Sequence, residues 1–498
     1  MSKHLTRRQF LRSSATTAAG AIAAPYLAFG GVSVTRPIRR ILGRTGFEVT
    51  TLGLGGQASL QWTPAGMDPV AIIVKAVEQG INYLDTSNVY GPSQQNFGKA
   101  FRALNLVPGL PNYDERKRRS IHLASKTMVR HAKGSHPGVP DRSEGAAGSR
   151  AVDDLRRTLS QIFGDGQGNY PEGAYLDLFQ IHNLNTMEEV DAIFVGLANP
   201  DPGAERIGAL AALVDFRDGT NRTGLNPKGE KLIRHIGITG HHSSPVMMEC
   251  LQRDDQNVID TMLIAINAND RRYLSHQHNA IPVAKAKDVG IIAMKVFADG
   301  AMYTKEPRWS RTPADVVQVV GTPDLPSRPL VEYALSTPGI ATAIIGIGRI
   351  DSDGRLCQLQ QNLSAAQVRA ESFSRGDRDE IERLAMRARE GKTNWFQVPQ
   401  QPLGAPREVA AAVENRGSRR ILRLTWQTAY AADEPISHYE IRRDGQPIGK
   451  TEHRPQTTKA PFSFEDADIK RDRHSYQVFT VDRIGRTAAG PVLEATAV

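Results

Sequence analysis

The chain has 498 residues, too many for one ordinary domain, and its 40% hydrophobic and 23% charged content is typical of a globular protein. Its two cysteines exclude a disulfide-stapled scaffold, a four-cysteine zinc site and an iron–sulfur cluster held by its own cysteines. The net charge of +9 is scattered along the chain, which does not favour nucleic-acid binding, and no apolar run reaches the ~18 residues of a membrane span.

The first thirty residues have the pattern of an export signal. The pair Arg7 and Arg8 precedes an alanine-rich stretch from Ala15 to Phe29, in which Ala21–Ala23 is a candidate cleavage site. This order resembles a twin-arginine signal. We therefore expect residues 1–30 to be a signal peptide that engages the twin-arginine export machinery, with the folded protein in the periplasm or elsewhere outside the cytoplasm. Retention of the uncleaved signal as a membrane anchor is the alternative.

Eight short apolar runs, separated by segments of helical character, follow the signal. Each run lacks alternation, which is typical of parallel strands covered on both faces. Strands alternating with helices predict an α/β fold, a (β/α)₈ TIM barrel, with an open doubly wound sheet as the competing arrangement. The runs are Thr51–Gly55, Ile81–Asp85, Ile121–Lys126, Leu176–His182, Ile233–Thr239, Met262–Asn267, Ile291–Val296 and Thr342–Ile347. Candidate helices are Pro69–Gln79, Ser149–Ile162, Ser243–Gln252, Asn279–Val289 and Pro329–Ser336.

Four inter-strand segments are long and rich in Gly, Pro, Asp and Arg: Asn105–Ser120, Arg130–Ser149, Asn199–Lys231 and Asp299–Ser327. Loops of this length are usually functional or disordered, and we expect part of the third to be an extra helix. Those after the third and seventh strands would lie on the active face of a barrel.

The hydrophobic period changes after about Pro402. Short strand candidates at Ile421–Trp426, His438–Arg442 and Tyr476–Asp482 are separated by turn signals, which indicates a β-sandwich. The last run resembles a fibronectin type III domain, in which Tyr476 would be the corner tyrosine. We expect a barrel at residues 37–395, a linker at 396–406 and a small all-β, fibronectin type III-like sandwich at 407–498.

Chemically active side chains end three consecutive predicted strands. Asp85 ends the second strand with Tyr90 five residues later, Lys126 ends the third, and His182 ends the fourth. In a barrel these ends meet on one face. Carbonyl reduction leaves an alkoxide that needs a proton, and tyrosine can supply it if a neighbouring ammonium lowers its pKa from ~10. Asp85 would keep the lysine charged, and His182 can donate a hydrogen bond to the carbonyl oxygen.

The stretch from Gly80 to Gly91 resembles the signature of the aldo-keto reductase family, and Lys126 and His182 match the rest of that family's tetrad in order and context. The resemblance covers residues from about 40 to 391. It implies that Tyr90 is the proton donor, that Lys126 and Asp85 tune it, and that His182 positions the carbonyl.

The same resemblance implies that NADP(H), or alternatively NAD(H), binds across the barrel mouth. Asp351 and Asp353 lie close to Arg349 in the sequence and would repel a cofactor phosphate if they faced it. The residues implied for the cofactor are Asn183, Asn267, Val296, Phe297, Gly346, Arg349, Gln361 and Asn362. Candidates for the substrate pocket are Gln57, Trp62 and His241.

The sequence thus predicts an exported NADP(H)-dependent oxidoreductase that acts on a small-molecule aldehyde, ketone or sugar carbonyl. The alternative is a non-catalytic or cofactor-retaining barrel that serves as a binding module, with the sandwich docking an envelope or carbohydrate partner. Glycoside hydrolysis is disfavoured because no acid ends the fourth or the seventh strand. No metal site is expected, since His241 and His242 are adjacent and no carboxylate motif accompanies them. Lys295 could be a Schiff-base lysine or only a charged lining residue.

Overall fold

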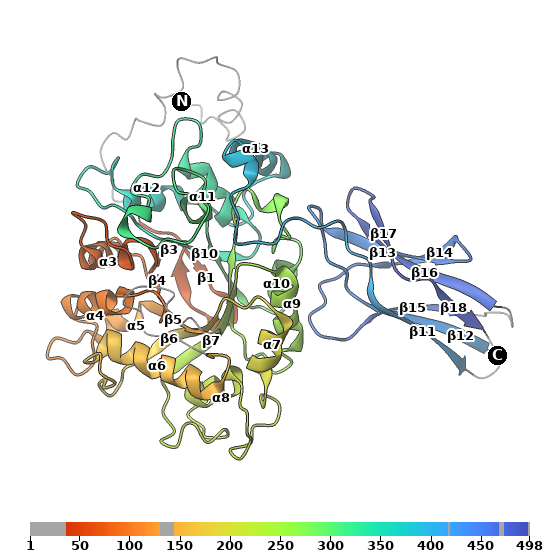
Figure 1. The fold of residues 1–498 in the computed structure, drawn as a ribbon, viewed down its shortest axis with the longest axis horizontal. Helices are drawn as coiled ribbons and strands as arrows, with labels where there is room; N and C mark the ends of the chain where they lie inside the picture. The colour runs from red at the N-terminus through yellow and green to blue at the C-terminus, as the bar shows by residue number, and fades with distance from the viewer. Residues whose placement is uncertain (1–35, 130–143, 417–418, 468–472, 497–498) are drawn as a thin grey trace, which may run out of the picture.

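A closed parallel barrel forms the larger part of the molecule (Figure 1). The computed structural model describes residues 36–129, 144–416, 419–467 and 473–496, so the predicted export signal lies outside the described residues. The barrel strands are β3 (Leu52–Gly55), β4 (Tyr83–Asp85), β5 (His122–Met128), β6 (Leu176–His182), β7 (Ile233–Gly240), β8 (Thr261–Ala265), β9 (Gly290–Met294) and β10 (Ile340–Ile345). They follow one another around the ring in chain order, and β10 closes it by pairing with β3. The predicted (β/α)₈ barrel is confirmed.

Alternation along the strands sends successive side chains to opposite sides of the barrel wall. Tyr83, Ala124 and Leu178 belong to a core inside the barrel, whereas Leu84 and Leu123 pack outward against the helices. Residues two positions after an inward-facing residue also face inward. Asp85, Lys126 and Gln180 occupy those positions and therefore enter the barrel at the C-terminal ends of their strands.

The other end of the barrel is closed by a hairpin that the sequence pattern did not reveal. Strands β1 (Arg39–Ile41) and β2 (Glu48–Thr50) pair antiparallel, and the turn between them buries Leu42 completely in the interior core. Gly43 lies so close to Gly290 that a Cβ there would come within 2.4 Å of its nitrogen. Because this end is filled, the barrel is open for chemistry only at its C-terminal end.

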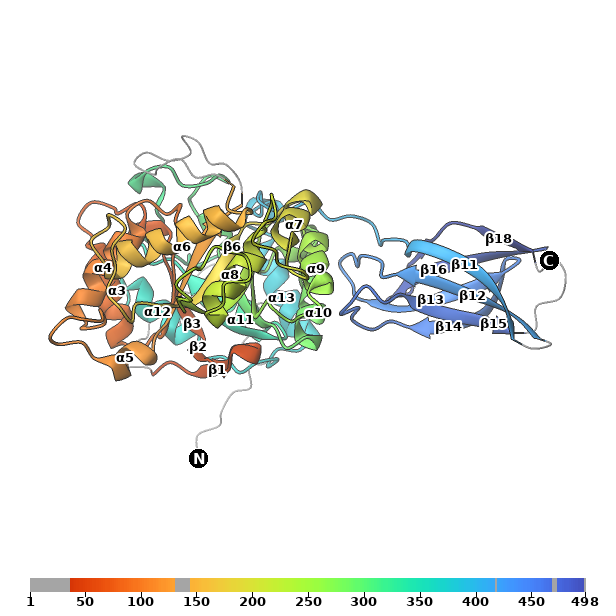
Figure 2. The same cartoon turned by 90° about the horizontal axis from the view of Figure 1, so that it is seen from below.

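Helices surround the barrel on its outer side (Figure 2). The predicted helices correspond to α3, α6, α9, α10 and α11, and α8 is an extra helix inside the long segment where one was expected. Helices α4, α5, α7, α12 and α13 were not predicted. The bounds are α3 (Pro69–Glu78), α4 (Ser93–Ala103), α5 (Glu115–Arg119), α6 (Gly148–Phe163), α7 (Met187–Phe194), α8 (Ala209–Asp218), α9 (Ser244–Arg253), α10 (Ala280–Ala286), α11 (Ser327–Ser336), α12 (Gln358–Ala365) and α13 (Arg375–Ala385). Within the described residues, no helix is long and apolar enough to span a membrane.

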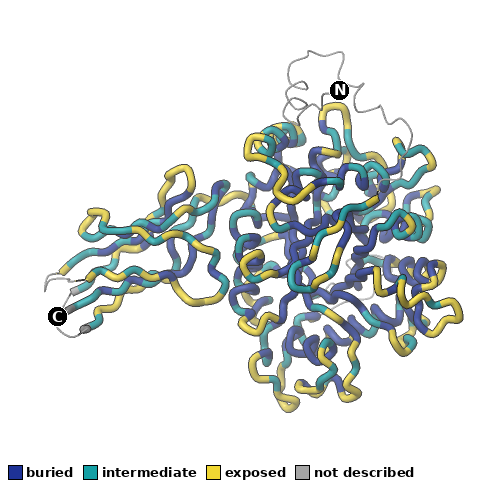
Figure 3. Tube along the Cα trace, turned by 180° about the vertical axis from the view of Figure 1, so that it is seen from behind, coloured by how far each residue is buried: buried dark blue, intermediate teal, exposed yellow. Residues whose placement is uncertain are grey.

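Two antiparallel sheets follow the barrel. One contains β11 (Arg407–Arg416), β12 (Arg419–Gln427) and β15 (Phe462–Ala467), and the other β13 (Ile436–Arg443), β14 (Gln446–Glu452), β16 (Arg473–Asp482), β17 (Thr487–Ala489) and β18 (Leu493–Thr496). Burial alternates along these strands, in contrast to the continuously buried barrel strands (Figure 3). Trp426 and Tyr439 are fully buried in a separate core. The Tyr476 hydroxyl donates to the Asp466 side chain at 2.7 Å, rather than to the backbone as a corner tyrosine would.

The β-sandwich lies against the side of the barrel at α9 and α10 (Figures 1 and 2). Asn279, at the start of α10, accepts from the Ala431 N–H at 2.8 Å and donates to the Ala431 carbonyl at 3.1 Å. Glu434 is 5% exposed and binds Arg271 at 3.0 Å and also Arg375. These contacts fix the sandwich on the barrel through buried polar groups.

The chain that joins the two parts is held by the barrel up to Gln400, whose N–H donates to the Arg272 carbonyl at 2.9 Å. Thr393 and Asn394 are fully buried, and the Val398 N–H donates to the carbonyl of His242 at 3.1 Å. The Leu274 N–H in turn donates to the Val398 carbonyl at 2.9 Å. Residues 393–398 therefore belong structurally to the barrel face, although they lie across the expected boundary between barrel and linker.

Candidate active site

The four tetrad candidates lie together inside the C-terminal end of the barrel. Lys126 binds the Asp85 carboxylate and donates to the Thr86 carbonyl at 2.8 Å. Gln180 donates to the other carboxylate oxygen of Asp85 at 3.3 Å. The neighbouring strands β4, β5 and β6 pair in a register that places Asp85 beside Ala124 and Lys126 beside Gln180. The strand register thus assembles this network.

Tyr90 is held by ring contacts with the other members. The Lys126 ammonium lies 4.9 Å from the centre of the Tyr90 ring, and the His182 ring lies edge-on to it at 5.7 Å. His182 is itself paired with the Ser87 hydroxyl through Nδ1 at 3.1 Å. The structure therefore brings together all four predicted residues at a single site.

Asp85 and Lys126 form an ion pair that is almost completely buried, with both side chains 1% exposed. Burial raises the pKa of Asp85 and lowers the pKa of Lys126, and the attraction between them opposes both changes. Lys295 lowers the pKa of Lys126 further. Such a pair is costly to break, because either partner alone would be an uncompensated buried charge.

The structure gives Tyr90 a pKa that differs in direction from the sequence-based expectation. Burial, followed by the negative charges of Asp85 and Asp299, raises the pKa of Tyr90 well above its usual value. Lys126 does not produce the expected decrease because its ammonium faces the ring and is paired with Asp85. The hydroxyl therefore carries its proton throughout the neutral range.

His241 and Asn183 lie next to this network. Nδ1 of His241 is 2.8 Å from Oδ1 of Asn183. Burial and the nearby charges of Lys295 and His182 lower the pKa of His241 well below its usual value, so the ring is neutral. A neutral ring donates to the amide oxygen through Nδ1 and keeps Nε2 as an acceptor. Asn183 has a left-handed backbone, with φ of 63°.

A cavity of about 130 Å³ extends from Tyr90 and Asp85 to Gly346 at the end of β10. Val296, Phe297 and Gly346 line it, as expected for cofactor-binding candidates, and so does Gln57. Trp62 is half-buried and does not line this cavity. Ligand sites for larger molecules usually have ~300–1,000 Å³. Part of the cavity wall is formed by residues 315–317 and Val320, which occupy space at the barrel mouth and so limit the cavity volume.

The candidate positions beyond Gly346 are linked to that wall. Gln358 accepts from the Gly348 N–H at 2.6 Å and donates to the Val317 carbonyl at 3.0 Å. Arg349 is paired with Asp351 at 2.5 Å, so the acidic residue noted in the sequence does face it. A Cβ at position 348 would lie 2.1 Å from the Val317 oxygen, which requires glycine there.

The two cofactor candidates on α12, Gln361 and Asn362, differ in their hydrogen bonding. The Gln361 amide donates to the Arg355 carbonyl. Asn362 is 1% exposed, and neither its amide oxygen nor its amide nitrogen has a hydrogen-bond partner among the described residues. Buried polar groups without partners are rare in folded proteins. Asn362 thus has the unsatisfied capacity of a residue that binds a ligand.

Asn267, another cofactor candidate, makes its hydrogen bonds within the protein. Its amide exchanges two hydrogen bonds with the Asn394 amide, at 2.8 and 3.0 Å, and donates to the Lys295 carbonyl at 3.1 Å. It is fully buried and is not among the residues that line the cavity. Asn267 therefore ties residues 393–398 to the barrel.

Sequence reasoning missed an ionic cluster and an aromatic cluster at the mouth. Lys295, noted without a role, binds Asp299 at 2.9 Å, and Lys305 binds the same carboxylate. The Trp309 ring contacts His241, Trp395 and Phe396, with centroids 5.4, 4.5 and 6.5 Å away. The only sequence signal was a lysine at the end of the seventh strand, since the other members come from loops.

Comparison with known proteins agrees with this arrangement. A model of the aldo/keto reductase family matches residues 51–378. Because this range contains the barrel and all four tetrad candidates, and spans more than half of the chain, the protein belongs to the aldo/keto reductase family.

Individual relatives are distant. "Uncharacterized oxidoreductase YqkF" of Bacillus subtilis (strain 168) is 23% identical over 350 residues, which is 66% of this chain and 92% of the relative. L-galactose dehydrogenase of Arabidopsis thaliana is 24% identical over 341 residues, or 66% of this chain and 87% of the relative. A crystal structure of an aldo-keto reductase from Klebsiella pneumoniae in complex with NADPH matches 70% of this chain and 95% of that chain, with 16% identity and a TM-score of 0.42.

Proposed function

We propose that the protein is an oxidoreductase that reduces the carbonyl group of an aldehyde, a ketone or a sugar, with NADP(H) as cofactor and Tyr90 as proton donor. The observation that supports this most is the convergence of Asp85, Lys126, Tyr90 and His182 at the C-terminal end of the barrel, beside a cavity that Asp85 and Tyr90 line. A sugar is included because one relative is an L-galactose dehydrogenase.

The side chains of the site have separable roles in this proposal. Bound reduced nicotinamide would supply the hydride. Tyr90 holds the proton, because its raised pKa keeps the hydroxyl protonated, and an alkoxide is a strong enough base to take it. His182 lies edge-on to Tyr90 and orients the carbonyl oxygen. Lys126, fixed by Asp85, places positive charge against the ring and stabilises the negative charge that develops on Tyr90 as its proton leaves.

The residues beyond Gly346 fit a dinucleotide. Asn362 offers an unpartnered amide for a base, and the Gly348 N–H and Arg349 are donors for phosphate oxygens. Arg349 is now paired with Asp351, so a 2′-phosphate would compete with that carboxylate. NAD(H), which lacks this phosphate, is therefore the alternative cofactor.

The Tyr90→Phe variant tests the function. The change removes the acid but little volume, so we expect turnover with an aldehyde to fall by ~10²-fold or more while nucleotide binding is preserved. Turnover is followed by nucleotide absorbance, and binding by the fluorescence of the reduced nucleotide. An unimpaired Phe variant would reject Tyr90 as the proton donor.

We also propose that the folded protein is exported through the twin-arginine route. The support is Arg7 and Arg8 ahead of an alanine-rich stretch. Replacing both arginines with lysine should leave a folded, full-length product in the cytoplasm. Export of the double variant at the normal level would reject the proposal.

For the C-terminal part we propose a fibronectin type III-like sandwich that serves attachment and not chemistry. Two sheets around Trp426, with a core of their own, support it. The candidate residues for the chemistry all precede Val398, which supports a sandwich without a catalytic role. Binding of the isolated residues 405–498 to envelope fractions or polysaccharide tests this role, and a sandwich without any such binding would count against it.

A further inference from the structure

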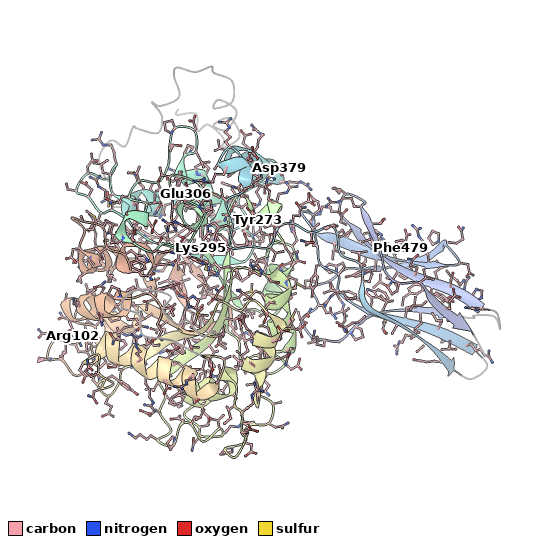
Figure 4. The ribbon with its side chains drawn as sticks, in the orientation of Figure 1. Arg102, Tyr273, Lys295, Glu306, Asp379 and Phe479 are labelled. Carbon is pink, nitrogen blue, oxygen red and sulfur yellow. The ribbon has the colours of Figure 1, made fainter. Side chains whose placement is uncertain are left out.

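A second ionic cluster lies beside Tyr90 and is not used in the proposed reaction. It consists of Lys295, Asp299 and Lys305, whose side chains are 8%, 13% and 3% exposed. The Lys295 ammonium donates to Asp299 at 2.9 Å and to the Gln57 amide oxygen at 3.0 Å. Lys295 and Asp299 line the same cavity as Tyr90. In Figure 4, Lys295 lies near the middle of the barrel.

The cluster has more positive than negative charge. Burial alone would raise the pKa of Asp299, but the two lysines outweigh it and lower that pKa, so Asp299 is ionised. Its single negative charge then faces two ammonium groups. Asp315, which also acts on Lys305, is itself paired with Arg308 at 2.6 Å, and the nearby pair of Asp85 and Lys126 is neutral as a whole. His241 is neutral as well. A buried excess of positive charge is unfavourable unless an anion compensates it.

The donors of this region are not all used. A lysine ammonium has three N–H donors, and Lys295 uses two of them on acceptors within the described residues. Its charge also lies 4.7 Å from the centre of the Trp309 ring. Trp395, which contacts the same ring, has a buried Nε1–H without an acceptor in the described part of the chain. Unused buried donors near an excess positive charge are suited to an oxyanion.

We propose that Lys295 binds an anionic group of the carbonyl substrate, which is therefore a carbonyl compound that carries a carboxylate or a similar oxyanion. This inference rests on the proposed function. The contacts favour the substrate over the cofactor phosphates as the source of the anion. Lys295 contacts Gln57 and Trp309, and Trp309 in turn contacts His241. Gln57 and His241 are two of the three candidates for the substrate pocket, the third being Trp62.

A matched pair of substrates isolates the charge. 4-Carboxybenzaldehyde and its methyl ester present the same carbonyl, and only the first is anionic at neutral pH. Wild-type protein should prefer the acid by at least tenfold in kcat/KM. Lys295→Gln should lower kcat/KM for the acid by about 10- to 100-fold and for the ester by less than about threefold. Lys295→Arg should keep most of the preference, because it keeps the positive charge.

The controls separate a lost charge from a damaged fold. Asp299 still has Lys305 as a partner in Lys295→Gln, so no buried carboxylate is left alone. Lys392→Gln removes the same charge from an exposed site, where the side chain is 71% exposed, and should behave as wild type with both substrates. Equal losses for acid and ester in Lys295→Gln, or no loss for either, would overturn the proposal.

Two binding measurements identify the source of the anion. The affinity for reduced nucleotide, read from nucleotide fluorescence, should be the same in wild type and Lys295→Gln within about threefold. A large loss would mean that Lys295 binds cofactor phosphates, which overturns the proposal. Quenching of tryptophan fluorescence by 4-carboxybenzaldehyde should weaken at least tenfold in Lys295→Gln, with Trp309→Phe identifying the reporter. Because quenching needs no turnover, it tests Lys295 even if neither aldehyde is reduced and the proposed function itself fails; unchanged quenching would refute the role of Lys295.

Discussion

Replacing Lys126 with methionine should destabilise the barrel in a strongly pH-dependent manner. The variant leaves Asp85, which is 1% exposed, with the Gln180 amide and without its ammonium partner. A buried carboxylate without a partner takes up a proton in preference to remaining charged.

The size of the effect follows from that proton. Asp85 starts from a usual pKa of 3.8, so protonating it at pH 7 costs about 4 kcal/mol. This cost is the ceiling on the loss through the carboxylate, and it agrees with the ~3–5 kcal/mol found when one partner of a buried pair is removed. The folded variant binds this proton and the unfolded chain does not. The loss relative to wild type is therefore greatest at neutral pH and falls by about 1.4 kcal/mol per pH unit toward pH 4.

Urea unfolding followed by tryptophan fluorescence, between pH 4.5 and 7.5, measures this loss. The double variant Asp85→Asn with Lys126→Met has no buried charge at either position, so its stability should recover most of the difference and should lose the pH dependence. A loss below about 1 kcal/mol at pH 7, or one that does not change with pH, would refute the buried-pair argument.

Three further predictions concern the surroundings of the site. Burial raises the pKa of Asp270 to about 7, so the folded state binds a proton that the unfolded chain has lost; stability should fall as pH rises from about 4 to 7 in wild type and less so in Asp270→Asn, measured by thermal unfolding. Asn394→Ala leaves Asn267 without its reciprocal amide partner and should cost about 1–3 kcal/mol in urea unfolding, while Gln401→Ala on the exposed linker should cost almost nothing. A chain truncated after Leu403 should keep nucleotide affinity, whereas one truncated after Gly391 should lose it or fail to fold, because only the longer chain retains Asn394 and Phe396; equal affinity of both would contradict this.

The barrel and the tetrad could be predicted because both depend on local patterns. Continuous apolar runs mark buried parallel strands, and the last inward-facing residue of such a strand lies at the active end. Asp85 and His182 occupy that position, and Lys126 is the inward-facing residue just before it, since β5 ends at Met128. The ends of the later strands were less well placed: Asn267 and Gly346 come just after β8 and β10, and only the three-dimensional structure shows which way each is turned.

The remainder of the site depends on contacts between distant segments. Asn267 and Asn394 are 127 residues apart, and nothing in either segment reveals the other. Lys295 and Asp299 both have left-handed backbones, with φ of 59° and 58°, which are uncommon for residues other than glycine. The direction of the Tyr90 pKa was also beyond the sequence, since it depends on where the Lys126 ammonium points and on Asp299 from another loop.

Gln358 couples ligand binding at Gly348 to the attachment of the cavity wall at Val317. Its amide oxygen accepts from the Gly348 N–H, and its amide nitrogen donates to the carbonyl of Val317, which is part of the cavity wall. A ligand that accepts a hydrogen bond from the Gly348 N–H must first displace the Gln358 amide. This displacement also weakens the attachment of the wall at Val317. The rate of ligand binding at Gly348 is then limited by the release of the Gln358 amide. In stopped-flow mixing, the observed binding rate should therefore level off as ligand concentration rises. Gln358→Ala should remove that plateau, because the variant has no amide to displace. One side-chain contact would thus set the time scale of ligand exchange at this site.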